Sequence, residues 1–152
     1  MFKKLNNIGD CGVVCDFGDE VNRSINTSVI KLFHHIKKEV SKGNLEGVLN
    51  YTPSYNKLII NFDLEKINSS KIIDFLKSVD FSRINISQNS KKWTIPICYD
   101  FEMDLKNMSK TLKIDKDEII NIHLNTDFFI YMVGFVPGHP FMGDLDSKLF
   151  LN

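Results

Sequence analysis

An uninterrupted apolar stripe in residues 22–41 constrains the fold of this chain more than any other feature. The stretch before it, 11–17, is rich in β-branched residues and ends at Gly18, which predicts a strand. A lysine followed by Gly43 is typical of a helix end. The chain is therefore expected to begin with a strand and a long amphipathic helix, because the apolar positions fall three or four residues apart: Val21, Ile25, Val29, Leu32, Phe33, Ile36 and Val40.

The next fifty residues continue the alternation of strand and helix. Two apolar runs, 48–51 and 57–62, predict strands, and the loop between them contains Pro53. A second helix is predicted at 70–79, capped by Asn68 or Ser69, and a further strand at 83–87. The order strand, helix, strand, strand, helix, strand matches the split βαβ pattern. The sequence thus predicts an α+β fold with a ferredoxin-like domain over residues 1–90.

A second part is predicted from residue 91 to residue 152, after the polar joint at 88–92. Asp115 and Glu118 have the spacing of a capping box, which predicts the start of a helix there. The expected elements are a strand at 93–99, a short helix near 105–112, a helix at 116–124 and a strand at 128–133.

The segment that follows the last predicted strand is the most unusual in the chain. Residues 134–143 hold three glycines and two prolines among Phe135, His139, Phe141 and Met142. Proline lacks a backbone donor and glycine often marks positive φ, so the segment predicts a rigid, exposed loop with free N–H groups. Such a loop can hold a small polar ligand or a partner protein. As a pattern alone, a structural turn explains it equally well.

Charge and cysteine content exclude several classes of function. Nineteen basic and nineteen acidic residues give a net charge of zero, so neither nucleic acid nor an anionic membrane is an expected partner. Three cysteines without Cys-x-x-Cys spacing suggest neither a disulfide framework nor a zinc site. Cys11, Cys15 and Cys98 are expected to be buried, reduced thiols, and the cytoplasm is the expected location.

No complete catalytic or metal-binding set can be assembled from the sequence. His123 near a predicted helix C-terminus is favoured as a cap over a ligand. The adjacent residues His34 and His35 diverge around a helix and are expected at the surface. Asp144 and Asp146 after the loop are more typical of solvated turns than of an acid–base pair. No metal site is predicted.

Several motifs in collinear order resemble one known family. They are Gly9–Gly18, the run from Pro53 to Ile60, Ile95–Tyr99, Asp104-Leu105, Ile119–His123 and Tyr131–Gly143. Together they resemble the family of the B subunit of 5-oxoprolinase, also described as allophanate hydrolase subunit 1. The family includes KipI, an inhibitor of a sporulation histidine kinase. The last motif, Gly-Phe-x-Pro-Gly-x-Pro-x-x-Gly, is the most specific one.

The resemblance implies an architecture and an activity. Residues 91–152 would begin a cyclophilin-like β-barrel and leave it incomplete. The chain would act with two other subunits in the ATP-dependent opening of 5-oxoproline, a small cyclic amide, to glutamate. ATP would serve the assembled enzyme, and no cofactor is expected on this chain. The residues expected to bind substrate or face another subunit are His123, Tyr131, Gly134, Phe135, Pro137, Gly138, His139, Pro140 and Gly143.

The resemblance also leaves alternatives open. His139 stands where the family usually has an aromatic residue, and family members continue well past the motif at 134–143. The same family contains inhibitors of sensor histidine kinases, so a kinase is the alternative partner. A third hypothesis is a subunit of the carboxyltransferase or allophanate hydrolase type, as in urea carboxylase.

Overall fold

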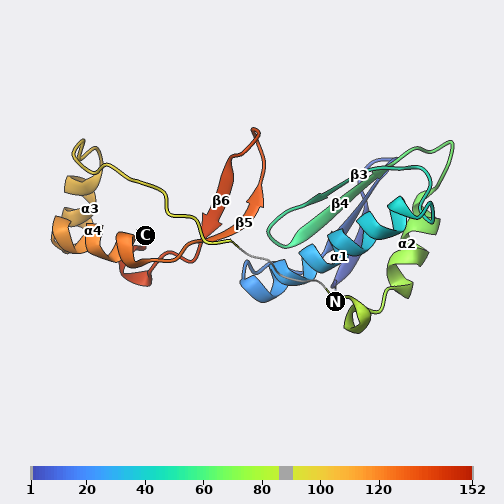
Figure 1. Ribbon diagram of the computed structural model, residues 1–152, viewed down its shortest axis with the longest axis horizontal. Helices are drawn as coiled ribbons and strands as arrows, with labels where there is room; N and C mark the ends of the chain where they lie inside the picture. The colour runs from blue at the N-terminus through green and yellow to red at the C-terminus, as the bar shows by residue number, and fades with distance from the viewer. Residues whose placement is uncertain (1, 86–90, 152) are drawn as a thin grey trace. The chain divides into compact units, whose positions relative to one another are not determined.

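The computed structural model describes residues 2–85 and 91–151 and divides into two compact units, Met1–Gln88 and Asn89–Asn152. Each unit is a mixture of helices and antiparallel strands, as Figure 1 shows, so the predicted α+β class is confirmed. The predicted joint at 88–92 lies partly outside the described residues. Among the described residues, none of the helices combines the length and the apolar character needed to cross a bilayer.

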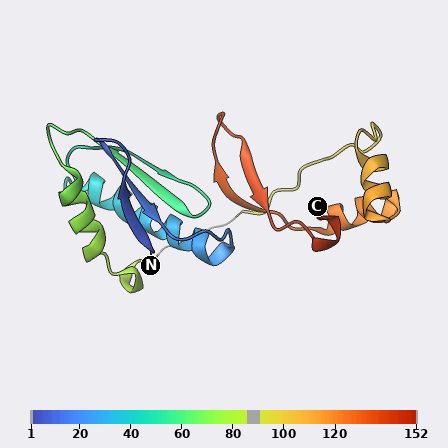
Figure 2. The same cartoon turned by 180° about the vertical axis from the view of Figure 1, so that it is seen from behind.

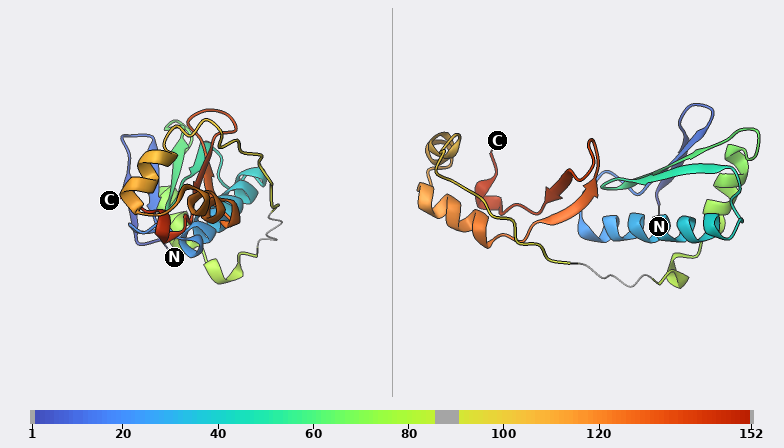
Figure 3. Two further views of the ribbon diagram at one scale, coloured as in Figure 1. Left: turned by 90° about the vertical axis from the view of Figure 1, so that its left-hand side faces the viewer. Right: turned by 45° about the horizontal axis from the view of Figure 1, so that its top comes forward.

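The first unit is a four-stranded antiparallel sheet with two helices. Its strands are β1 (Lys4–Asn7), β2 (Gly12–Asp16), β3 (Val48–Pro53) and β4 (Lys57–Phe62), in the spatial order β1-β2-β4-β3. Helices α1 (Arg23–Ser41) and α2 (Ser69–Ser78) lie on one side of the sheet, as the right-hand view of Figure 3 shows. Strand β4 lies between β2 and β3, which is the predicted split βαβ arrangement.

The fourth strand of this sheet differs from the sequence-based expectation. A strand was predicted at 83–87, but a 3₁₀ turn, η1 (Phe81–Arg83), occupies its start, and residues 86 and 87 lie outside the described residues. The place beside β2 is taken by β1, which forms a hairpin with β2 in the register Lys4↔Asp16 to Asn7↔Val13. Pairing β1 with β2 closes only the short loop between them, so the loss of conformational entropy is small.

The core lies between the sheet and the two helices. Its fully buried side chains come from every layer and include Cys15, Leu32, Leu58, Phe62 and Leu76. Burial raises the pKa of the Cys15 thiol to about 12, so this thiol is protonated at neutral pH. Cys11, by contrast, is exposed, because β2 begins only at Gly12. The expectation of a buried thiol holds for Cys15 and is wrong for Cys11.

One buried polar side chain joins α1 to the loop between β3 and β4. The amide nitrogen of Asn26 donates to the carbonyl oxygens of Ser54 (3.3 Å) and Tyr55 (3.1 Å). Asn26 is 2% exposed and occupies a position that the apolar stripe of the sequence did not mark. Its hydrogen bonds therefore hold the β3–β4 loop against the helix.

Replacing Asn26 by alanine should destabilise the first unit by about 2 kcal/mol, because two backbone carbonyls lose their partner in a buried place. Chemical unfolding followed by circular dichroism measures the change. Ser24→Ala, an exposed change on the same helix, should shift the free energy of unfolding by less than about 0.5 kcal/mol. If Asn26→Ala is as stable as the unchanged protein, the hydrogen bonds of Asn26 do not contribute to the stability of the unit.

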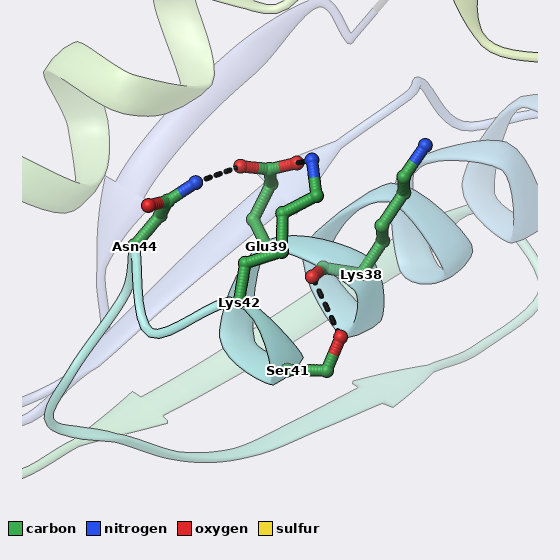
Figure 4. Close-up of polar contacts among 5 residues, drawn as sticks. All are labelled: Lys38, Glu39, Ser41, Lys42 and Asn44. Atoms are coloured by element: carbon green, nitrogen blue, oxygen red, sulfur yellow. Dashed lines mark hydrogen bonds and ion pairs between the residues drawn. The ribbon is translucent and has the colours of Figure 1, made fainter.

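The C-terminal end of α1 is closed by a small polar cluster, drawn in Figure 4. The carboxylate of Glu39 accepts hydrogen bonds from Asn44 (2.6 Å) and Lys42 (2.9 Å). These bonds, that of Asn44 first, hold the pKa of Glu39 below its ordinary value. The Ser41 hydroxyl donates to the carbonyl of Lys38. The helix therefore ends where the lysine and glycine of the sequence predict.

The second unit contains two short helices and a β-hairpin. The helices are α3 (Leu105–Leu112) and α4 (Lys116–Asn125), and the hairpin pairs β5 (Phe129–Val133) with β6 (Pro140–Gly143). A 3₁₀ turn, η2 (Ser147–Leu149), follows. Figure 2 shows the hairpin and the helix pair from the opposite side. Both helices and β5 confirm the sequence-based predictions.

The predicted strand at 93–99 is wrong. The structure shows no helix or strand over residues 91–99, and the residues from 91 to 98 are exposed. In the part of the chain that the structure describes, Trp93, Ile95 and Ile97 are exposed and enter no core, and Cys98 is exposed rather than buried. The alternating pattern of a half-buried strand is present, but within the described residues no neighbouring strand pairs with it. The cyclophilin-like barrel stays a prediction.

Candidate functional site

The Gly/Pro segment forms the turn and second strand of a β-hairpin. Strand β5 pairs with β6 in the register Phe129↔Gly143 to Val133↔Pro140. The turn between them is closed by backbone bonds from Gly134 N to His139 O (3.1 Å) and from His139 N to Val136 O (3.2 Å). The expectation that 134–143 forms a loop throughout is therefore wrong, since its last four residues form β6.

Fewer backbone donors face outward than the sequence suggested. The N–H groups of Gly134, Val136 and His139 are hydrogen-bonded inside the turn, and Pro137 has none. Within the described residues, the N–H groups of Phe135 and Gly138 make no hydrogen bond. Both residues have positive φ, +66° and +80°. The turn therefore offers two backbone N–H donors, and the hydrogen bonds of the other turn residues hold the backbone around them in place.

Aromatic side chains gather at the hairpin tip. The rings of Phe135 and His139 are 6.4 Å apart, and the rings of His139 and Phe141 are 5.0 Å apart, both edge to face. Phe135 is 93% exposed, and Val133 and Val136 beside it are also exposed. We call Val133, Phe135, Val136, His139 and Phe141 the hairpin tip. It combines apolar surface with an imidazole in the place where the sequence predicted a site.

The base of the hairpin is held by a tyrosine. Tyr131 is buried, and its hydroxyl donates to the Asp144 carboxylate (2.6 Å). Gly143 lies against the ring of Tyr131, where an added Cβ would come within 2.7 Å of Cε2. Tyr131 and Gly143, both predicted as site residues, therefore pack the hairpin. Asp144 is exposed as expected, but its carboxylate holds Tyr131, which the interpretation as a solvated turn residue did not predict.

Replacing Gly143 by alanine should destabilise the second unit by about 1–3 kcal/mol, because a rigid ring and not a flexible side chain stands in the way. Thermal unfolding monitored by near-ultraviolet circular dichroism measures this change. The matched control is Gly134→Ala, where an added Cβ meets only the mobile end of Met132. If the two variants unfold at the same temperature, the tight packing at Gly143 is incorrect.

His123 belongs to a second group of side chains at the end of α4. Its Nδ1 is 2.6 Å from the hydroxyl oxygen of Tyr99, and its ring is 5.1 Å from that of Phe128. The N–H of Thr126 bonds to the His123 carbonyl and ends the helix. The hydroxyl of Tyr99 therefore holds the imidazole of His123 in place, a contact that the interpretation of His123 as a helix cap did not predict. In the sequence, only the place of Tyr99 in the motif Ile95–Tyr99 pointed to this residue.

Described residues of the first unit line the following two hollows. One, of about 380 Å³, lies where α1, α2 and η1 meet, and there His35 stacks on Phe75 at 5.8 Å. His34 is exposed, as expected. The other, of about 480 Å³, lies between β1 and α2. No group of three metal-ligating side chains is present in the part of the chain that the structure describes.

Comparisons with known proteins match the chain over almost all of its length. A family model described as carboxyltransferase domain, subdomain C and D, matches residues 3–152. The chain is 26% identical over 159 residues to the B subunit of 5-oxoprolinase from Bacillus subtilis (strain 168). That alignment covers 96% of this chain and 65% of the relative, so the chain spans somewhat less than two thirds of that protein.

Two solved structures share the fold. The crystal structure of TTHA0988 is 21% identical, with a TM-score of 0.73, and the match covers 92% of this chain and 27% of that one. The urea carboxylase of Kluyveromyces lactis is 15% identical, with a TM-score of 0.58, and the match covers 86% of this chain and 13% of that one. In both, the matched region is a small part of a longer chain.

Proposed function

Because this chain belongs to the family of the carboxyltransferase domain, subdomain C and D, we propose that it is a subunit of a 5-oxoprolinase-type hydrolase that depends on partner subunits. The relative from Bacillus subtilis is itself named as a subunit. The proposed reaction is the opening of the cyclic amide 5-oxoproline, with ATP used by the assembled enzyme. The observation that carries the proposal is the hairpin tip at the most specific motif.

The hairpin tip has the properties of a contact surface. The side chain of Phe135 is 93% exposed. It lies in a turn that is fixed by backbone hydrogen bonds between the neighbouring residues. Exposed aromatic side chains on an ordered scaffold contribute strongly to protein–protein binding, because little conformational freedom is lost when they are covered. The tip therefore suits a second protein chain that buries Phe135 and its neighbours.

The same turn suits a small polar substrate at that contact. Opening a cyclic amide places negative charge on the carbonyl oxygen, and backbone N–H groups stabilise such charge best when they are fixed and shielded from water. The N–H groups of Phe135 and Gly138 are the candidate donors, and His139 is the nearby imidazole. A partner that covers the tip would supply the shielding and the groups that use ATP.

Co-purification tests the subunit role. The tagged chain should be co-expressed with the proteins of its source that resemble the other 5-oxoprolinase subunits, and native mass spectrometry should find them in one complex. A sensor histidine kinase, tested in the same way, should not co-purify. Recovery of the kinase without the oxoprolinase-like proteins would replace the proposal with the inhibitor role that the family also contains.

A further inference from the structure

The outer edge of the first sheet borders a hollow that the proposed function does not use. The hollow of about 480 Å³ lies between edge strand β1 and helix α2, and both elements are drawn in Figure 2. Its apolar lining comes from Phe2, Leu5 and Ile73, which are partly buried. Lys3, Lys4 and Lys77 also line it, and no acidic residue does.

The floor of this groove is fixed by packing. The ring of Phe2 meets those of Phe17 and Phe81 edge to face, at 6.3 and 6.0 Å. Ile73 and Leu5 pack against the main core of the unit. The groove therefore exists in the free chain, and a ligand would not have to order it first.

Two lysines of the groove, Lys3 and Lys77, keep their charge available to a ligand. Neither forms an ion pair within the described residues, and both are exposed. Lys4 is different, because it is the cross-strand partner of Asp16 and its side chain lies on the face of the sheet opposite Leu5. The hydrogen bond from the N–H of Gly18, then Lys57 at 3.1 Å and Lys4, hold the pKa of the Asp16 carboxyl below its ordinary value. Asp74 lies one turn before Lys77 on α2 but does not line the groove, so the groove face carries two positive charges and no acid.

The edge strand offers backbone groups along the same groove. Ile8 N bonds to Gly12 O, so this residue directs its backbone toward β2. Backbone groups alternate along an antiparallel strand, so Asn6 also faces β2, while Leu5 and Asn7 face the outer edge. Within the described residues, no strand pairs with that edge. An extended segment laid beside β1 would satisfy these groups and pass along α2.

We propose that the groove between β1 and α2 binds an extended, acidic segment of a partner protein as an added strand. Backbone bonds at Leu5 and Asn7 would hold the segment, apolar side chains would cover Phe2 and Ile73, and carboxylates would meet Lys3 and Lys77. Charge argues against a second copy of this chain in the same place, because edge-to-edge pairing would bring two sets of these lysines together. This binding is independent of the proposed hydrolase role.

The probe for the test is the acetylated hexapeptide Glu-Glu-Val-Val-Glu-Glu, titrated into the ¹⁵N-labelled full chain, because this order puts both residue types on the groove face of a strand. It should bind about tenfold more tightly than the same peptide with glutamine in place of glutamate, because the charge pairs with the lysines are lost. Amide hydrogen exchange at Leu5 and Asn7 should slow when the glutamate peptide is bound. The exchange of Asn6, already bonded to β2, should change little.

Matched variants locate the site. Lys77→Glu and Lys3→Glu should each weaken peptide binding about tenfold, while Lys71→Glu, an exposed change on α2 outside the groove, should not. Amide spectra of the free variants confirm that they are folded. Equal binding of the glutamate and glutamine peptides, or binding without slower exchange at Leu5 and Asn7, would overturn the proposal. So would attachment to phosphatidylserine vesicles in the absence of any peptide binding, which would assign the lysines to a membrane surface.

Discussion

Replacing Phe62 by alanine should destabilise the first unit by about 3–5 kcal/mol, which is enough to unfold a marginally stable domain at room temperature. Phe62 ends β4, is 1% exposed and belongs to the main core. Its removal takes a large apolar side chain out of the layer between sheet and helices and leaves a cavity that rigid neighbours cannot fill. Urea unfolding monitored by far-ultraviolet circular dichroism gives the free energy directly.

The control lies two residues further along the chain. Leu64 is 56% exposed, so Leu64→Ala should change the free energy of unfolding by less than about 0.5 kcal/mol. The contrast separates burial from position in the chain. A loss below about 1 kcal/mol for Phe62→Ala would show that Phe62 is not in the core.

Replacing Phe135 by aspartate should abolish assembly with partner subunits while leaving the fold intact. At 93% exposed, the side chain contributes little to the stability of the free chain, so the circular dichroism spectrum should not change. Loss of a central aromatic contact costs about 2 kcal/mol or more, which is about thirtyfold in the dissociation constant. A buried, unpaired carboxylate adds to that penalty. Co-purification and analytical ultracentrifugation measure the loss.

Phe101→Asp is the control for surface chemistry. Phe101 is 80% exposed in the same unit but lies outside the hairpin, so its replacement adds the same charge at a different place. The variant should assemble like the unchanged protein. Equal assembly of the Phe135 and Phe101 variants would show that the hairpin tip is not the contact surface.

Much of the first unit could be predicted because its signals are local and redundant. The stripe of α1, its lysine–glycine end and the Asn68 cap of α2 each depend on neighbouring residues alone. Asn68 accepts a bond from the N–H of Lys71, as a helix cap does. The strands β3 and β4 are long and apolar enough to be recognised. Their order in the sheet follows from the split βαβ rule.

The errors lie where partners outside the segment decide the structure. Strand β1 has the sequence Lys-Leu-Asn-Asn, which carries no strand signal, and it forms because β2 offers an edge a short loop away. Residues 93–99 have the alternating pattern of a strand, but a strand needs a neighbour, and the described chain supplies none there. The same reason leaves Cys98 exposed.

The candidate site was located in sequence but its geometry was not. Gly, Pro and aromatic residues at 134–143 marked the turn, yet the pairing that makes 140–143 a strand depends on β5. The roles of Tyr131 and Gly143 in packing follow from one close approach that spacing does not reveal. The contact of Tyr99 with His123 joins residues 24 positions apart and was likewise hidden.

The most direct test of the proposed function is ATP hydrolysis that depends on 5-oxoproline. The co-expressed subunits should be assayed with this chain, without it, and with its Phe135→Asp variant, in each case with and without 5-oxoproline. The account predicts that 5-oxoproline stimulates ATP hydrolysis only when the unchanged chain is present. Stimulation of the same size without the chain, or none with all subunits assembled, would contradict it.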